Sequence, residues 1–478
     1  MAAIVDERAL DAGLAGLEAA RNWSPRVISR LEAVIREGDD AQLFRLNPLT
    51  LARQRDIAPD EAVDLLLHAT AQGLFEMDWL LVCPRCACAV ESFARLRAVL
   101  SRYRCPQCHN EYEAAMDDFI AVYFNVAPAI AATRYQRPET LEPFDYMFHY
   151  KGVREGHRPD GVPYIDGSRD AMLAIGFLEP GRTTGFHLTA PPGLVVGISA
   201  DTEAGFALEV AEGPSPAPQR LVLSFAGNAY RPEEVSVAAG PVELDIANPT
   251  DRRCVVALLA MAPGQDDGFL RFDPFLTGKG LLTSQTFRSL FRSEVVGGAQ
   301  GLAIRDIAIL FTDIKGSTEL YRRIGDLNAY QLVQQHFDWL REATVRHGGA
   351  VVKTIGDAVM AAYPDAASAV AAALAMRTAA ERQGRGQAGG PVELKIGLHH
   401  GAAIAVTLND ELDYFGQTVN VASRVQEEAG AQEICLTAEV WDFPGVRELL
   451  AGQRTAHASA AFRGLDHPTP IVRIAPPG

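Results

Sequence analysis

Apolar residues recur at helical spacing over the first part of the chain. They do so over 9–19 and 27–35, and Pro59 opens a further stretch of this kind. The segment 77–82 that follows is apolar and predicts a strand. The resulting order of helix, turn, helix and strand is compatible with a winged-helix shape. We therefore expect a helical, winged-helix-like region over 1–80.

The pattern changes between 119 and 262 to short alternating apolar runs that are divided by glycine and proline, which predicts β-sheet. The run 212–219 contains three prolines and predicts a linker between two β subdomains. Helical spacing returns over 281–295, ahead of a glycine-rich stretch. We expect an amphipathic helix in a linker over 263–300. It is placed to transmit a signal to the next domain, although core packing explains the pattern more simply.

Strand and helix patterns alternate in the last third of the chain. The hairpin signal is strongest at Gly356-Asp357, because this dipeptide favours a tight turn. The order strand, helix, hairpin, helix, strand predicts a ferredoxin-like core. The predicted elements are a strand over 306–314, a helix that begins after 315, a helix over 327–346, a hairpin over 350–363, a helix over 365–382 and a strand over 392–400.

Length and charge limit the class of protein. The 478 residues allow about three domains. The net charge of −16 argues against binding to duplex DNA, which requires basic side chains to neutralise phosphates. The first residues lack the pattern of a secretory signal, and no apolar run reaches the roughly 18 residues that would suggest a membrane span. We expect no nucleic-acid partner, no integral membrane segment and a cytoplasmic location.

Five of the seven cysteines lie between 83 and 108. Two pairs with two-residue spacing form two knuckles, and such a pair of knuckles predicts a closed four-sulfur zinc site. A closed site favours a structural role. A metal-free thiol cluster, or a site with Cys88 or His109 as a ligand, remains an alternative. The predicted ligands of one structural Zn²⁺ per chain are Cys83, Cys86, Cys105 and Cys108.

Two aspartates lie where the predicted elements can bring them together. Asp313 ends a buried strand and Asp357 lies at the tip of the adjacent hairpin. Two carboxylates can bind hard divalent cations, which prefer oxygen ligands. Farther along, Asn420 and Arg424 are four residues apart and share one face of a predicted helix.

Three segments resemble the catalytic signatures of class III adenylyl cyclases. They are Phe311-Thr-Asp-Ile-Lys-Gly-Ser-Thr318, Lys353-Thr-Ile-Gly-Asp357 and Asp413-Tyr-Phe-Gly-Gln-Thr-Val-Asn-Val-Ala-Ser-Arg424. Their order and spacings also fit, and the resemblance covers about 302–478. The residues before 300 resemble, more loosely, the zinc-ribbon-bearing regions found ahead of some bacterial cyclase domains.

The resemblance implies an adenylyl cyclase that converts ATP to 3′,5′-cyclic AMP and pyrophosphate at a homodimer interface, with two Mg²⁺ or Mn²⁺ ions in each site. The implied metal ligands are Asp313, Ile314 and Asp357. The implied catalytic residues are Asn420 and Arg424. The implied triphosphate contacts are Gly316, Ser317, Thr318 and Arg463.

The resemblance implies that Lys353 and Asp413 choose the base. A lysine in a strand that should be mostly buried needs a partner, and a donor and an acceptor at these positions complement the edge of adenine. Guanine reverses both polarities, so the pair favours ATP over GTP. A turn residue is the alternative interpretation of Asp413.

Two other functions stay open: a guanylyl cyclase, and a nucleotide-sensing zinc-ribbon regulator with an inactive cyclase domain. We expect the amino-terminal region to regulate the adenylyl cyclase, with an unknown ligand or protein as the regulatory partner. The whole chain is predicted to be a multidomain α+β protein. Its expected parts are a helical, winged-helix-like region over 1–80, a zinc ribbon over 81–118, a β-rich region over 119–262, a linker over 263–300 and a ferredoxin-like α/β cyclase domain over 301–478.

Overall fold

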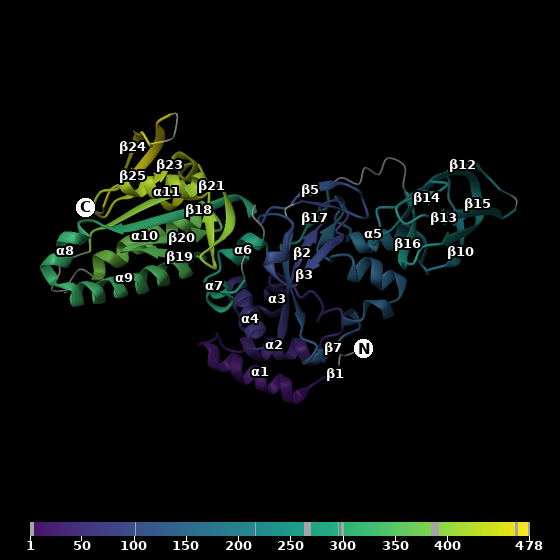
Figure 1. The fold of residues 1–478 in the computed structure, drawn as a ribbon, viewed down its shortest axis with the longest axis horizontal. Helices are drawn as coiled ribbons and strands as arrows, with labels where there is room; N and C mark the ends of the chain where they lie inside the picture. Colours follow the sequence, from purple (N-terminus) through teal and green to yellow (C-terminus); the bar gives the residue numbers. More distant parts are fainter. Residues whose placement is uncertain are drawn as a thin grey trace. The chain divides into compact units, whose positions relative to one another are not determined.

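The computed structural model describes residues 4–100, 102–215, 217–261, 269–294, 296–297, 301–383, 392–463 and 467–476. The chain divides into two compact units (Figure 1). The amino-terminal unit comprises Met1–Ala94, Arg102–Ala114 and Phe119–Leu276, and the carboxy-terminal unit comprises Arg95–Ser101, Ala115–Asp118 and Thr277–Gly478. Parts of the predicted linker, at 263–268, 295 and 298–300, lie outside the described residues.

The amino-terminal unit begins with helices where apolar spacing predicts them. Asp6 caps the first helix, since its side chain accepts a hydrogen bond of 3.0 Å from the backbone of Ala9. Pro59 occupies the first turn of the fourth helix, where its missing N–H is tolerated. These helices are α1 (Glu7–Ala20), α2 (Val27–Glu37), α3 (Pro48–Arg55) and α4 (Pro59–Ala71).

A small sheet follows α4. Its central strand β2 (Phe75–Val82) pairs antiparallel with β3 (Ala89–Phe93) and β6 (Ile120–Val126). The smaller elements of this unit are β1 (Ile4–Val5) paired with β7 (Ala131–Ala132), β4 (Arg102–Arg104) paired with β5 (Glu111–Glu113), β8 (Gly156–His157) paired with β17 (Arg271–Phe272), and the helix α5 (Tyr164–Ala171).

The β-rich part of this unit is one eight-stranded sheet system in the order β14-β13-β15-β12-β11-β16-β9, with β10 paired to β15. The run 212–219, expected to link two β subdomains, instead contains the end of β12 and the start of β13, two strands that both pair with β15. Strands on either side of this run therefore belong to one sheet system. The strands are β9 (Met172–Leu178), β10 (Arg182–Ala190), β11 (Gly193–Ile198), β12 (Phe206–Pro214), β13 (Gln219–Phe225), β14 (Tyr230–Arg231), β15 (Glu234–Asn248) and β16 (Cys254–Met261).

The carboxy-terminal unit is built on a second sheet, in the order β19-β20-β18-β21-β23-β25-β24 with β22 paired to β21. The predicted order of strand, helix, hairpin, helix and strand is confirmed. The strands are β18 (Leu302–Ile314), β19 (Ala350–Ile355), β20 (Ala358–Tyr363), β21 (Leu394–Leu408), β22 (Glu411–Phe415), β23 (Ile434–Thr437), β24 (Thr455–Ala460) and β25 (Thr469–Ile474). The helices are α8 (Ser317–Ile324), α9 (Asp326–Arg346), α10 (Ala366–Gln383), α11 (Gln417–Glu427), α12 (Ala438–Trp441) and α13 (Val446–Leu449).

Helices cover both faces of this sheet. Leu340 of α9 and Val370 of α10 are buried in the cluster that covers one face, whereas Val425 of α11 packs in a separate cluster. Gly397 on β21 allows α11 to approach closely, because a Cβ atom at this position would lie 2.1 Å from the backbone nitrogen of Gln426. Among the described residues, every helix is too short or too polar to span a bilayer.

The amphipathic helix expected over 281–295 is instead two short helices, α6 (Gly278–Leu282) and α7 (Gln285–Leu290). Ser284 causes the break, since its side chain accepts a hydrogen bond of 3.3 Å from the backbone of Phe287 and caps α7. The apolar spacing still serves packing, because Leu281 and Phe287 are fully buried. The position 295 lies outside the described residues.

A buried histidine of α9 predicts how the stability of this unit depends on pH. Burial lowers the pKa of His336 to about 4, whereas the unfolded chain protonates this ring near pH 6.5. As the pH falls from about 6.5 to about 4, the unfolded state binds a proton at this ring and the folded state does not. The free energy of unfolding therefore falls by up to about 3 kcal/mol.

We expect His336→Gln to flatten the loss of unfolding free energy between about pH 7 and pH 4.5, measured by urea titration. The matched control is His187→Gln, because His187 is exposed and no comparable change is expected there. If the unfolding free energy depended on pH equally in the wild type and in His336→Gln, the lowered pKa of His336 would not explain the loss of stability.

Candidate active site

Two carboxylates meet at one end of the carboxy-terminal sheet. Asp313 lies at the end of β18, and Asp357 lies in the turn between β19 and β20, where Gly356 adopts a left-handed φ of 63°. The pairing of Thr312 with Val359 places the strand end beside the turn. We call Asp313 and Asp357 the carboxylate pair.

The electrostatics of the carboxylate pair fit a bound cation. Burial, and then the charge of Asp357, raise the pKa of Asp313, and Lys395 opposes this shift without cancelling it. The Oδ2 atom of Asp357 is buried without a hydrogen-bond partner among the described residues. A hard divalent cation would relieve both conditions. The side chain of Ile314 is buried and apolar, so only its backbone carbonyl is available as a further ligand.

Two neighbours of the carboxylate pair were not expected from the sequence. Burial and the charge of Asp357 raise the pKa of Tyr321, on α8, to about 12. Gln426 of α11 is 7 % exposed, and its amide lowers the pKa of Asp313. The four-residue spacing of Ser317 and Tyr321 on one helix is a signal that could have indicated the tyrosine.

The residues expected to contact the triphosphate begin α8. Gly316 is the N-cap, with a left-handed φ of 70°, and Ser317 and Thr318 form the first turn. The first backbone N–H groups of a helix have no partner within the helix and can bind an anion. This end of α8 therefore offers phosphate-binding donors close in sequence to the carboxylate pair.

Lys353 on β19 and Asp413 on β22 form an ion pair, with 2.5 Å between Nζ and Oδ2. The side chain of Asp413 is 9 % exposed and that of Lys353 is 37 % exposed. The lysine is thus less buried than expected, because β19 is an edge strand. Asp413 is also not a turn residue: the turn is made by Asn409 and Asp410, which have left-handed φ angles.

The α6–α7 segment holds the strands that carry this ion pair. Arg288 donates hydrogen bonds to the carbonyls of Leu412 (2.8 Å) and Leu282 (3.0 Å), and the hydroxyl of Tyr414 donates to Leu282 at 3.1 Å. Gln285 accepts a hydrogen bond of 2.9 Å from the backbone of β19. A cavity of about 410 Å³ adjoins Lys353; other residues that line it include Arg288, Arg292, Arg341 and Glu411.

Asn420 and Arg424 lie on α11, as expected from their spacing. Asn420 is exposed, and the guanidinium of Arg424 donates a hydrogen bond to the carbonyl of Arg463, whose side chain is also exposed. Within the part of the chain that the structure describes, no hydrogen bond or ion pair joins these three residues to the carboxylate pair or to the Lys353–Asp413 pair.

The four predicted zinc ligands come together in the amino-terminal unit. Their sulfur atoms all lie within 4.8 Å of one another, and this group contains neither Cys88 nor His109. The two knuckles have the same backbone form, because Ala87 and His109 follow them at equivalent positions with left-handed φ angles of 51° and 61°. Such a set of four thiols fits a tetrahedral zinc ion.

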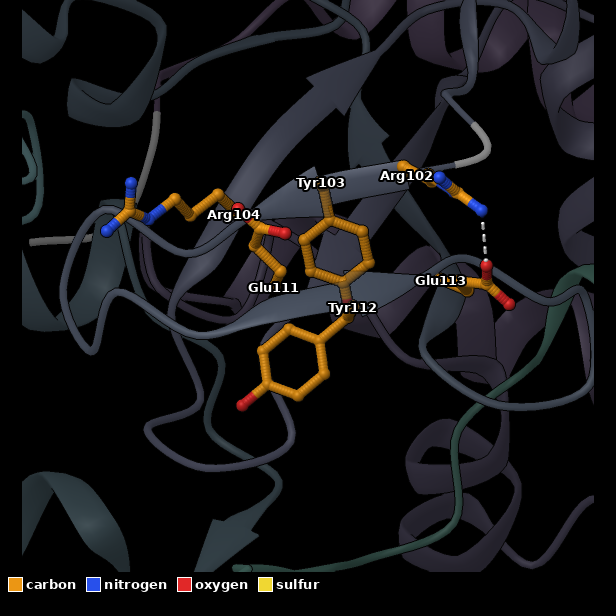
Figure 2. A pocket seen from close by; sticks show the side chains of 6 residues that line it. All are labelled: Arg102, Tyr103, Arg104, Glu111, Tyr112 and Glu113. Carbon is orange, nitrogen blue, oxygen red and sulfur yellow. Dashed lines mark hydrogen bonds and ion pairs between the residues drawn. The ribbon is translucent and has the colours of Figure 1, made fainter.

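The hairpin of β4 and β5 borders this cluster. Figure 2 shows Tyr103 and Tyr112 against each other, with 5.4 Å between ring centroids, and Arg102 paired with Glu113 at 2.8 Å. The hydroxyl of Tyr112 lies 3.7 Å from the sulfur of Cys83. The thiol of Cys83 is the donor in this contact, and the hydroxyl could donate in return only after that thiol has lost its proton to a metal.

Comparison with known families gives two matches. Residues 12–289 match a family of unknown function (DUF5939), which covers more than half of the chain. The chain belongs to this family. Residues 302–449 match the adenylate and guanylate cyclase catalytic domain, so the resemblance of the carboxy-terminal signatures to cyclases is confirmed. We refer to this part as the cyclase domain.

Individual relatives include adenylate cyclases. Adenylate cyclase 2 of Rhizobium meliloti is 29% identical over 150 residues, which are 29% of this chain and 41% of the relative. An adenylate cyclase of Streptomyces coelicolor is 32% identical over 131 residues, 27% of this chain and 32% of the relative. The structure of the adenylyl cyclase CyaB from P. aeruginosa is 22% identical, with a TM-score of 0.33, covering 37% of this chain and 97% of that one. The chain thus spans less than half the length of these two curated relatives.

The cysteine cluster yields a prediction about metal content. Elemental analysis should find about one zinc per chain, and Cys83→Ser or Cys105→Ser should lower the melting temperature of the amino-terminal unit, because zinc binding stabilises the fold. Cys88→Ser is the matched control: Cys88 is buried beside the cluster but outside it, so zinc should be retained. Zinc-free protein with an unchanged melting temperature would contradict the prediction.

Proposed function

We propose that this protein is an adenylyl cyclase, which converts ATP to 3′,5′-cyclic AMP and pyrophosphate at sites shared by two copies of the chain. The observation that carries this choice is the ion pair between Lys353 and Asp413 in the cyclase domain.

The ion pair matches the edge of adenine. Adenine accepts a hydrogen bond at N1 and donates one from N6, whereas guanine donates at N1 and accepts at O6. Lys353 is a donor and Asp413 an acceptor, so adenine satisfies both side chains. Asp413 is almost fully buried, and leaving such a group unpaired costs about 1–3 kcal/mol or more. This penalty supports selection of ATP over GTP.

The carboxylate pair and the Ile314 carbonyl would hold two divalent cations, Mg²⁺ or Mn²⁺. When bound, such ions neutralise the triphosphate and favour ionisation of the ribose 3′-hydroxyl. The chain itself supplies the anion-binding turn of Gly316, Ser317 and Thr318, which would orient the phosphates for in-line attack on the α-phosphorus.

The face of α11 supplies the remaining groups. Arg424 would stabilise the charge that develops on the α-phosphate, and Asn420 would orient the ribose. Arg463 would add a positive charge near the triphosphate. Asn420 is exposed and therefore available to a substrate or to a second chain.

The separation of these groups supports a shared site. Among the described residues of one chain, the carboxylate pair makes no contact with Lys353, Asp413 or Arg424 through a hydrogen bond or ion pair. A head-to-tail homodimer would bring the carboxylate pair of one copy to the base-reading and α11 groups of the other, and would form two equivalent sites.

The regions before the cyclase domain would regulate it. We interpret 81–118 as a zinc ribbon with one structural Zn²⁺, between the winged-helix-like region 1–80 and the β-rich region 119–262. The linker 263–300 contains α6 and α7, whose hydrogen bonds to the strands of Lys353 and Asp413 support a role in transmitting a signal to the site.

Product identification tests the proposed activity. Purified chain should convert ATP with Mg²⁺ or Mn²⁺ to cyclic AMP, identified by chromatography and mass spectrometry, and use GTP at least about tenfold less well. Asp357→Ala should lower turnover by at least about a hundredfold. Cyclic GMP as the main product would contradict the assignment of the base. Absence of any product from folded protein would favour the nucleotide-sensing alternative.

Mixing of variants tests the shared site. Asp313→Ala and Arg424→Ala should each be nearly inactive, but co-expression should restore about a quarter of wild-type activity. About half of the dimers would then be mixed, and one of their two sites would be intact. Cyclase assays on co-purified, differently tagged chains measure this recovery. No recovery, with mixed dimers present, would indicate that each site lies within one chain.

A further inference from the structure

The amino-terminal unit contains a cavity of about 260 Å³ beside α2 and α3. Its wall is rich in positive charge, although the chain as a whole carries −16. Four arginines and two acidic residues are among the side chains that line it: Arg45, Arg53, Arg55, Arg154, Glu155 and Asp273. Such an excess of guanidinium groups in a hollow is typical of oxyanion recognition.

Arg154 is poorly satisfied by the protein. A guanidinium has five N–H donors, yet the hydrogen bond recorded for Arg154 among the described residues is a single long one of 3.4 Å to the carbonyl of Phe44. The side chain remains accessible, while desolvation by the surrounding protein lowers its pKa. Arg154 is exposed and lines the cavity.

The two acidic side chains of the cavity wall already have partners within the protein. Both carboxylate oxygens of Glu155 accept hydrogen bonds of 3.0 Å, one from Asn47 and one from the hydroxyl of Tyr123. Asp273 lies 3.7 Å from Arg53. Glu155 is therefore held in place by neutral donors and does not satisfy Arg154 through a hydrogen bond.

Two of the other arginines, Arg45 and Arg55, differ in the number of partners that their side chains have. Arg45 is fixed, because it pairs with Asp78 at 3.2 Å and donates to the carbonyl of Tyr150 at 2.7 Å. The side chain of Arg55 makes no hydrogen bond or ion pair within the described part of the chain, and it lines the cavity. Arg55 and Arg154 thus leave donors available on the same cavity wall.

We propose that this cavity binds a small oxyanion, a phosphate or carboxylate group of a small molecule, with Arg154 and Arg55 as its principal donors. The volume lies just below the range of about 300–1,000 Å³ that drug-sized ligands occupy, which favours a small metabolite. The site lies within the region matched by the family of unknown function and is independent of the proposed cyclase chemistry.

Calorimetric titration of the full chain without divalent cations tests this site, with sodium phosphate in one arm and sodium succinate in the other, at constant ionic strength. At least one oxyanion should bind with a dissociation constant below about 10 mM. Arg154→Gln should weaken that binding at least about tenfold, since a charge-assisted bidentate contact is lost. Arg220→Gln is the matched control, because Arg220 is 84 % exposed and lies outside this cavity.

The two titrations distinguish a phosphate ligand from a carboxylate ligand. Binding of phosphate alone assigns a phosphoryl ligand, and binding of succinate alone assigns a carboxylate. If Arg154→Gln does not fold, Arg55→Gln should show the same loss. If neither oxyanion binds, the proposal is overturned. It is also overturned if the substitution in the cavity leaves the affinity unchanged, because the bound anion would then occupy another site.

Discussion

The contact on which the proposed site depends is the ion pair of Lys353 and Asp413. It joins two strands that are far apart in the order of the sheet, and its carboxylate is nearly buried. Because a buried charge without a partner is costly, Asp413 needs a nearby positive charge, which Lys353 supplies. In the proposed complex the uncharged N6 amine of adenine adds a hydrogen bond to Asp413 and does not replace Lys353 as its counter-charge. The α6–α7 segment makes hydrogen bonds to the backbone of both strands, so Lys353 and Asp413, which we propose to read the base, lie on strands that the preceding linker contacts.

The carboxylate pair differs from the ion pair, because it brings two like charges together. Burial and the charge of Asp357 raise the pKa of Asp313, and the Oδ2 atom of Asp357 has no hydrogen-bond partner among the described residues. The fold tolerates this because β18 and the β19–β20 hairpin are fixed by their pairing and by the helices packed on the sheet. The fold thus keeps an unfavourable arrangement of charge where we propose that a cation binds, whereas Asp413 already has Lys353 as a partner where we propose that a base binds.

The features that could be predicted from the sequence are those that depend on short-range residue patterns. The hairpin at Gly356-Asp357 and the two cysteine knuckles have short-range patterns, and the structure has both. The break between α6 and α7 was missed because the cap at Ser284 competes with an unbroken apolar spacing. The role of β15 in uniting strands on both sides of 212–219 depends on long-range pairing. The arginine-lined cavity likewise assembles from residues such as Arg55 and Arg154, which share no local pattern.

The most direct test of the central claim is the ratio of kcat/KM for ATP to that for GTP in the double variant Lys353→Glu, Asp413→Cys. If these side chains read the base, the ratio should fall at least about tenfold, since adenine loses both partners. Asn420→Ala should lower both rates and leave the ratio unchanged, because Asn420 is proposed to contact the ribose. A ratio equal to that of the wild type in the double variant would contradict the claim and would show that the base is read elsewhere.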